Sequence, residues 1–135
     1  MTVRSPATDT ASLIDGFFDA LEQGSVDGVR NSYASDATIW HNFDQVSMTP
    51  DESLAGVRTL FQSFVTRRYV DVRRHPTSTG LVQQHVLRLG TSDGKTIDWP
   101  GCIVFEIRDG LISRLDEYVD MATLASAPDN GETHG

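Results

Sequence analysis

Three side chains suited to proton transfer lie on stretches whose residues alternate in the manner of β-strands. Along residues 81–89, alternation places Gln83 and His85 on the same side as three leucines. Along residues 111–120, it places Glu117 on an otherwise apolar side. An imidazole and a carboxylate that share an apolar surface can pass a proton to or from a bound molecule. We therefore expect His85 to act as a base, with Glu117 orienting it or acting as the acid, where the two lie within hydrogen-bonding reach.

Each of these assignments has a structural alternative. Glu117 could form an ion pair with Arg88 or Arg114 at the rim of a sheet, since charged groups are rarely buried without a partner. His85 could be a hydrogen-bonded histidine of the core or of an interface. The functional interpretation depends on burial, because moving a carboxyl group into an apolar site generally raises its pKa toward a range useful for catalysis.

Two more candidates occur in a short strand expected over residues 38–42. Asn42 could hold a water molecule or a substrate carbonyl, although capping a loop is the commoner role of asparagine. Its neighbour His41 is expected on the opposite face unless a bulge exchanges the two, and it is a second candidate base. Aromatic residues would form the pocket wall, although aromatic side chains at such spacings mostly serve packing. The expected substrate-binding side chains are Trp40, Gln83, Trp99, Phe17, Phe18, Phe61 and His41.

The elements that position these residues follow from side-chain patterns and turn chemistry. Turns rich in glycine and aspartate separate three late strands, and the sequence Thr49-Pro50-Asp51-Glu52 is a strong helix start. Alternation puts Leu111 and Ser113 on the core side of the last strand. The expected elements are helices from Thr8 or Asp9 to Gly24, from Ser25 to about Tyr33 and from Thr49 to about Thr66, strands over 38–42, 69–74, 81–89, 95–107 and 111–120, a loop over 43–48 and a helical turn over 121–127.

This order predicts a single α+β domain over residues 9–127, with helices on one face of an antiparallel sheet. A long sheet curls around its helices and can leave a cavity at its open end, and Pro100-Gly101 in mid-strand favours such bending. Residues 1–8 are expected to fray and residues 128–135 to be disordered. The 135 residues suffice for one hydrophobic core and are too few for two.

Composition argues against several partners. The formal net charge of −8 disfavours nucleic acid and anionic membrane surfaces, which are themselves polyanions. The single cysteine, Cys102, excludes an internal disulfide, and no Cys/His cluster has the spacing of a zinc site. We expect neither a metal nor a cofactor, because a glycine-rich phosphate loop is absent too.

No apolar run approaches the ~20 residues that span a bilayer, and the first ten residues lack a signal-peptide core, so a cytoplasmic location is expected.

The face of the sheet opposite the helices is also unusually apolar. It would carry Val82, Val86, Cys102 and Val104, which are too apolar for a sheet surface in contact with water. We expect a second copy of the chain to pack sheet against sheet over this face, giving a homodimer. Alternatively, the loop that begins at Pro76 and the C-terminal tail cover it.

The helix-first order, together with the stretches DATIWHN (36–42) and GKTIDWPGCIVFEIRDGLISRLDEYVD (94–120), resembles the nuclear transport factor 2-like superfamily. That group includes ketosteroid isomerases, polyketide-cyclase-like proteins and limonene-epoxide-hydrolase-like enzymes. The resemblance covers about residues 9–125. It implies a cone-shaped α+β roll and a homodimer, and it implies no particular reaction, because one fold supports many chemistries.

Within that superfamily, the epoxide hydrolases offer the closest register. The resemblance puts Glu117 at the position of their catalytic acid and Asn42 at that of their water-holding asparagine, with Trp40 where they have a tyrosine. It also puts Gln83 and His85 where they have a catalytic arginine and aspartate. Without that arginine and aspartate, the family's way of opening an epoxide cannot operate in its known form.

Ketosteroid isomerases are a poorer match. They need a tyrosine on the first helix, where Phe17 or Phe18 stands, and a hydrogen-bonding aspartate where Cys102 or Ile103 stands. Their general base falls near residues 41–42. A steroid isomerase of the known type is therefore not expected.

Two classes of function remain open. The first is a cofactor-free enzyme that acts on a small hydrophobic molecule (terpenoid, steroid-like or polyketide-like) by general acid/base catalysis, through isomerisation, dehydration, cyclisation or addition of water. We favour it because polar groups that converge on aromatic walls are costly for a passive core. The second is a dimer of the same fold that binds a small ligand without turnover.

Overall fold

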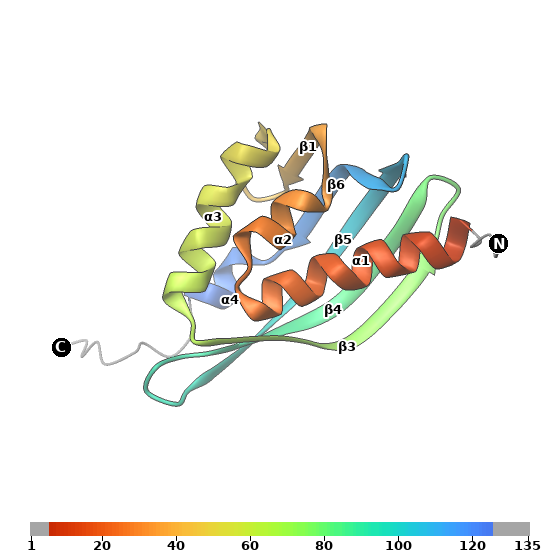
Figure 1. Cartoon of the computed structure of the whole chain (residues 1–135). Coiled ribbons are helices and arrows are strands. Elements are labelled where there is room, and N and C mark those ends of the chain that lie inside the picture. The colour runs from red at the N-terminus through yellow and green to blue at the C-terminus, as the bar shows by residue number, and fades with distance from the viewer. Residues whose placement is uncertain (1–5, 126–135) are drawn as a thin grey trace.

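The computed structural model of the chain describes residues 6–125, which form helices packed against a curved six-stranded sheet (Figure 1). The expected disordered tail lies outside the described residues, as do residues 1–5 of the expected frayed N-terminus; residues 6–8 belong to the first helix. In chain order the elements are α1 (Pro6–Gln23), α2 (Val26–Asn31), β1 (Tyr33–His41), β2 (Ser47–Met48), α3 (Pro50–Ser63), β3 (Thr66–Pro76), β4 (Gly80–Gly90), β5 (Thr96–Arg108), β6 (Leu111–Val119) and α4 (Met121–Ala125).

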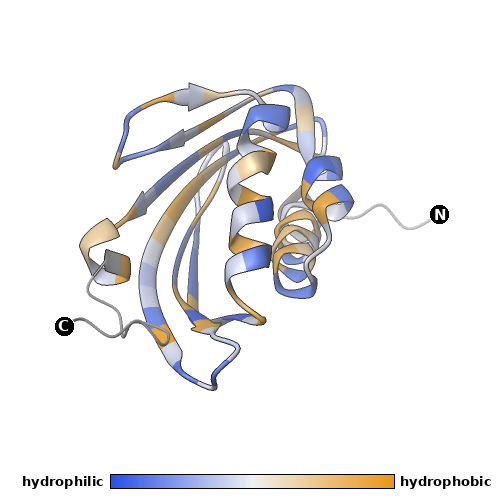
Figure 2. Ribbon diagram, turned by 90° about the vertical axis from the view of Figure 1, so that its left-hand side faces the viewer, coloured by the Kyte–Doolittle hydropathy of each residue, from blue (hydrophilic) through white to orange (hydrophobic). Residues whose placement is uncertain are grey.

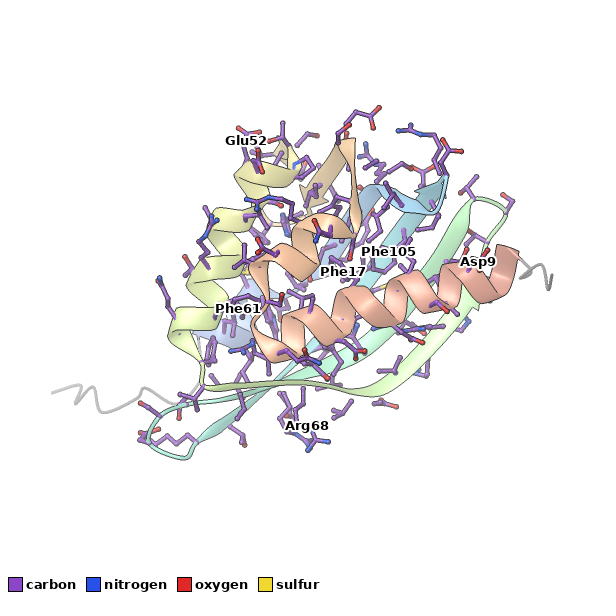
Figure 3. The ribbon with its side chains drawn as sticks, in the orientation of Figure 1. Asp9, Phe17, Glu52, Phe61, Arg68 and Phe105 are labelled. Carbon is purple, nitrogen blue, oxygen red and sulfur yellow. The ribbon has the colours of Figure 1, made fainter. Side chains whose placement is uncertain are left out.

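Helices α1 and α2 are separated by a glycine turn. Gly24 has a φ of 75°, a left-handed conformation that glycine adopts without a steric penalty, and it ends α1. The Ser25 hydroxyl then accepts a hydrogen bond from the backbone N–H of Gly28 and caps α2. The apolar face of α1 rests on the sheet, and the ring centroids of Phe17 and Phe105 lie 5.7 Å apart between them (Figure 3).

Helix α3 begins where the sequence predicts. The Thr49 hydroxyl accepts a hydrogen bond from the backbone N–H of Glu52, and the Glu52 carboxylate accepts one from the backbone N–H of Thr49. This reciprocal pair, with Pro50 at the first helical position, satisfies backbone donors that a helix start leaves free. The helix ends at Ser63 rather than near Thr66, because Thr66 already opens the next strand.

A buried arginine closes the C-terminal ends of α1 and α3. The Arg67 guanidinium donates hydrogen bonds to the carbonyl oxygens of Leu21 at 2.8 Å, Glu22 at 3.3 Å and Phe64 at 2.8 Å. It also lies over the Phe61 ring, 4.7 Å from its centroid. The last carbonyls of a helix have no partner within the helix, so one cation satisfies two helix ends here.

The strands are ordered β2-β1-β6-β5-β4-β3. The four late strands form the predicted antiparallel meander. Strand β1 departs from the prediction: it starts at Tyr33 instead of residue 38 and runs parallel to β6, so the sheet is mixed. A short strand, β2, also forms within the expected loop over residues 43–48. Turned by 90°, the sheet is seen to bend around the helices, which confirms the predicted curved α+β architecture (Figure 2).

Alternation predicts the core face of β4 correctly and that of β6 in part. Leu81, Gln83, His85, Leu87 and Leu89 are all buried. In β6, an irregularity between Glu106 and Ile107 of β5 shifts the pairing by one residue. Ile112 therefore fills the core position expected for Leu111 and Ser113, and Leu111 is exposed. Leu115 and Glu117, beyond the shift, keep the predicted face.

No helix within residues 6–125 is long and apolar enough to cross a membrane.

Candidate functional site

A cavity of about 800 Å³ lies between α3, α4 and the inner face of the sheet. Its walls are mainly apolar, and they include Leu60 and Phe64 of α3, Leu87 of β4, and Ile97 and Trp99 of β5. The volume is in the range of pockets that enclose small organic molecules. What this cavity can do chemically depends on its polar groups.

A histidine and a glutamate face each other in this cavity. The Nε2 atom of His41 lies 3.1 Å from Oε1 of Glu117, and both side chains are half-buried and line the cavity. The pair forms because β1 runs alongside β6 with these two residues in register. Ile39 is buried on the same face, so β1 alternates as a strand with His41 directed inward.

The charge of His41 depends on Glu117. Burial lowers the pKa of His41, but the hydrogen bond to Glu117, its negative charge and that of Asp44 outweigh burial, so the pKa is raised above its ordinary value. The other ring nitrogen, Nδ1, is buried and has no hydrogen-bond partner among residues 6–125. An ionised carboxylate can only accept hydrogen bonds, so Nε2 of His41 carries a proton and donates it to Oε1 of Glu117.

Two tyrosines, one buried and one half-buried, add hydroxyl groups to the cavity wall. Tyr33 at the start of β1 and Tyr69 in β3 both line the cavity. Burial, reinforced by the negative charge of Glu117, raises the pKa of both phenols. Neither hydroxyl has a hydrogen-bond partner within the described part of the chain. Both phenols therefore stay protonated and can donate to an oxygen of a bound molecule.

His85 belongs to a separate hydrogen-bond network, which runs from the exposed Asp15 to the buried Gln83 and His85. The Asp15 carboxylate accepts from Arg74 at 2.7 Å, Arg74 donates from Nε to Oε1 of Gln83 at 2.7 Å, and Nε2 of Gln83 lies 2.9 Å from Nδ1 of His85. Because arginine only donates, the Gln83 amide nitrogen faces the imidazole, and Nδ1 of His85 accepts. The proton of the neutral ring is then on Nε2.

The surroundings of His85 keep it uncharged. Burial lowers its pKa to about 4, although the charge of Glu117 opposes the shift. The imidazole packs edge-on against the rings of Phe18 and Tyr69. No hydrogen bond or ion pair joins it to Glu117 among residues 6–125, and it does not line the cavity. The pairing on which the expectation for His85 depended is made instead by His41.

The remaining sequence candidates are divided between the cavity, the core and the far side of the sheet. Asn42 exchanges two hydrogen bonds with the backbone of Val119, at 2.9 and 3.1 Å, which ties the end of β1 to that of β6. Trp40 packs against Tyr118, away from the cavity. The cavity is lined by Phe17 and Trp99 but not by Gln83, Phe18 or Phe61, which pack elsewhere.

Sequence reasoning missed several polar residues of the cavity, and Tyr33, Tyr69 and Asp44 are the ones with titratable groups. Tyr33 was expected at the end of a helix, and Asp44 in a featureless loop. For Tyr69 a signal existed, because alternation from the buried Arg67 places it on the inner face of β3. Within residues 6–125, no group of three or more His, Cys, Asp or Glu side chains could hold a metal ion.

Comparison with known proteins places this geometry in context. Residues 14–115 match the family model of the SnoaL-like domain. No curated protein matches the chain at a significant level. Many solved structures share the fold.

Three of these structures illustrate the likeness. A protein named as a SnoaL-like polyketide cyclase from Jannaschia Sp. CCS1 is 20% identical, with a TM-score of 0.76 over 96% of this chain and 100% of its own. A protein named as a polyketide cyclase from Xanthomonas campestris pv. campestris is 17% identical, with a TM-score of 0.77 over 89% and 96%. An LEH-like epoxide hydrolase from M. tuberculosis is 17% identical, with a TM-score of 0.70 over 87% of each chain. Identities this low establish a shared fold, and the chemistry must be argued from the cavity itself.

Proposed function

Since the chain belongs to the SnoaL-like domain family, we propose that it is a cofactor-free enzyme that acts on a small hydrophobic molecule by general acid/base catalysis. The observation that carries this proposal is the His41–Glu117 pair, whose nitrogen and oxygen lie 3.1 Å apart in an apolar cavity of about 800 Å³. A hydrogen-bonded carboxylate and imidazole in a site of this kind provide a proton acceptor and a means of holding it in place.

In the proposed reaction, Glu117 is the proton acceptor. Its Oε1 atom is held by His41, and its Oε2 atom has no hydrogen-bond partner among the described residues. Oε2 takes a proton from a carbon next to a carbonyl group, the C–H electron pair moves into the carbonyl, and an enolate forms. His41 is the positioning residue in place of His85, and Asn42 supports the site by fixing the ends of β1 and β6.

Tyr33 and Tyr69 supply the second part of the proposed chemistry. The carbonyl oxygen gains negative charge as the proton leaves, and a donor aimed at that oxygen lowers the barrier. Both phenols line the cavity, and Glu117 is close enough to raise the pKa of both. The proton on Glu117 then returns to another carbon of the enolate in an isomerisation, or to a departing hydroxyl in a dehydration. In a cyclisation, the enolate carbon attacks a second carbonyl carbon of the same molecule, and the proton goes to the alkoxide oxygen that this attack forms.

These reactions share the removal of a proton from the carbon beside a carbonyl group, and this step can be measured without knowing the substrate. We would incubate the protein in D₂O with apolar ketones (a cyclohexenone, a decalone and a tetralone) and follow deuterium incorporation beside the carbonyl by mass spectrometry. General bases contribute roughly 10²–10⁴-fold, so a ketone that fits should exchange at least about a hundredfold faster than in buffer. Glu117→Gln should abolish that gain. The matched control is Glu106→Gln, which removes an exposed carboxylate from β5.

A non-catalytic, ligand-binding dimer is the second candidate. It is favoured by one observation, namely that Gln83 and His85, at the positions of the epoxide hydrolases' arginine and aspartate, are buried away from the cavity. Ketones that bind, as seen by native mass spectrometry, but exchange no faster than in buffer would decide for this candidate and against the enzyme.

A further inference from the structure

Two carboxylates and one histidine are the charge-bearing side chains in the described lining of the cavity. Asp44 and Glu117 line it together with His41, and no lysine or arginine does so in the part of the chain that the structure describes. The negative charge reaches across the cavity, since Glu117 affects the pKa of both Tyr33 and Tyr69. Within apolar walls such a charge is screened less than it would be in water.

Arg67, the one buried cation among residues 6–125, is not available to a ligand. Arg67 is hydrogen-bonded to three backbone carbonyl oxygens and stacked on Phe61, and it does not line the cavity. An anionic group entering the cavity would meet the carboxylates of Asp44 and Glu117, and the one cation-forming side chain in the described lining, His41, is already paired with Glu117. Carboxylates and phosphates are therefore poor ligands here.

The exposed loop after β1 brings a carboxylate and an aromatic ring to the cavity wall. Asp44 is exposed in the loop after β1, and its Oδ1 atom accepts one hydrogen bond, from the backbone N–H of Val46 at 3.0 Å. Phe43, half exposed, packs beside the His41 ring with 5.2 Å between centroids. Trp99 adds a second aromatic wall. An ammonium group donates hydrogen bonds and is attracted to aromatic faces, so it complements each of these features.

We infer that the molecule this cavity takes carries a protonated amine on an apolar body, with the amine at Asp44 and the body between the aromatic walls. The inference deepens the proposed function, because it uses the same cavity and leaves Glu117 free for proton transfer. It states that the cavity binds a cationic amine more tightly than a neutral or anionic molecule of equal size.

Three probes that share one apolar body and differ in charge test whether the cavity prefers a cationic ligand: phenylbutylamine, phenylbutanol and phenylbutyrate. Their dissociation constants are measured by native mass spectrometry and by calorimetric titration near pH 7.5. The amine should bind about tenfold more tightly than the alcohol, and the carboxylate about tenfold more weakly or not at all. Asp44→Asn should remove most of the amine's advantage and leave alcohol binding unchanged. The matched control, Asp19→Asn, removes an exposed charge from α1 outside the cavity and should change nothing.

Each contrary outcome is decisive. Equal binding of amine and alcohol, tighter binding of the carboxylate, or failure of all three probes to bind at millimolar concentration would overturn the inference. An advantage for the amine that survives Asp44→Asn would overturn it too, because the net charge of the protein alone would then explain the preference. The deuterium experiment is separate: exchange of neutral ketones without an amine preference refutes only this inference, and an amine preference without exchange refutes only the enzyme.

Discussion

His41 and Glu117, which are 76 residues apart in sequence, are joined by a hydrogen bond of 3.1 Å because β1 and β6 lie side by side in parallel. Both strands direct these side chains to the inner face, and His41 is the last residue of β1. The pair lines the cavity, and Glu117 raises the pKa of His41.

The first prediction concerns the pH dependence of this pair. The folded-state pKa of His41 is raised above its unfolded value of 6.5, so its protonated form stabilises the fold fully below that value, and this contribution is lost as the pH rises through the raised pKa. Chemical denaturation at about pH 5.5 and about pH 9 should show that Glu117→Gln costs more stability at the lower pH. An equal cost at both values would contradict the ion pair.

The second prediction has the opposite sign and concerns His85. Its folded-state pKa is lowered from 6.5 to about 4, so the stability that its neutral form provides is present above pH 6.5 and declines as the pH falls toward 4. The full shift corresponds to about 3 kcal/mol. In urea denaturation at about pH 7 and pH 4, His85→Gln should lose less stability on acidification than the natural chain. Parallel losses in both proteins would show that His85 titrates normally.

The strands that sequence reasoning placed correctly are those without irregularities. In β4 a strict period of two runs from Leu81 to Leu89, and all five alternate residues are buried as predicted. In β6 the same reasoning fails at Leu111, because one extra residue at the start of the strand cannot be seen in an apolar pattern that tolerates either register.

The candidate site was harder to predict than the fold for a physical reason. Glu117 was found because a lone carboxylate on an apolar strand is conspicuous. The sequence predicts His85 as its partner, with His41 as a second candidate base, because alternation fixes the face of each histidine but not which strand lies beside which. The parallel pairing of β1 with β6 is a long-range contact, and no local signal in either strand specifies it.

The third prediction tests how tightly His85 is held. A methyl group added at Gly101 would lie 3.1 Å from Nε2 of His85 and 3.3 Å from Cγ1 of Val119. The imidazole cannot easily give way, because Gln83 fixes its other nitrogen. Gly101→Ala should therefore destabilise the fold by about 1–2 kcal/mol in thermal or urea denaturation. Gly16→Ala, inside α1 with open space around it, should instead stabilise by about 0.5–1 kcal/mol. A neutral Gly101→Ala would mean that His85 moves freely.

The fourth prediction concerns the outer face of the sheet, where we propose that a second copy packs. Val82, Val86, Cys102 and Val104 are only half-buried there. Light scattering after gel filtration should give twice the chain mass of 14.9 kDa at micromolar concentration. Val86→Lys should give the monomer, because it would bury a charge without a partner in the interface. Val65→Lys, at an exposed site after α3, should leave the dimer intact. A natural chain that elutes as a monomer contradicts the proposal.

The last prediction separates the two tyrosines from the pair. Tyr33→Phe and Tyr69→Phe each remove one hydroxyl that has no protein partner, so neither change leaves a buried polar group unsatisfied and each should alter stability by less than about 1 kcal/mol. If the phenols stabilise an enolate, each change should slow deuterium exchange by roughly 10²-fold, and the double variant should lose most of the rate that Glu117 provides. The loss should fall on kcat rather than on KM, because the oxygen carries its full charge only in the transition state. Exchange that persists in the double variant would show that the carboxylate acts alone, and the phenols would then serve only to shape the wall of the cavity.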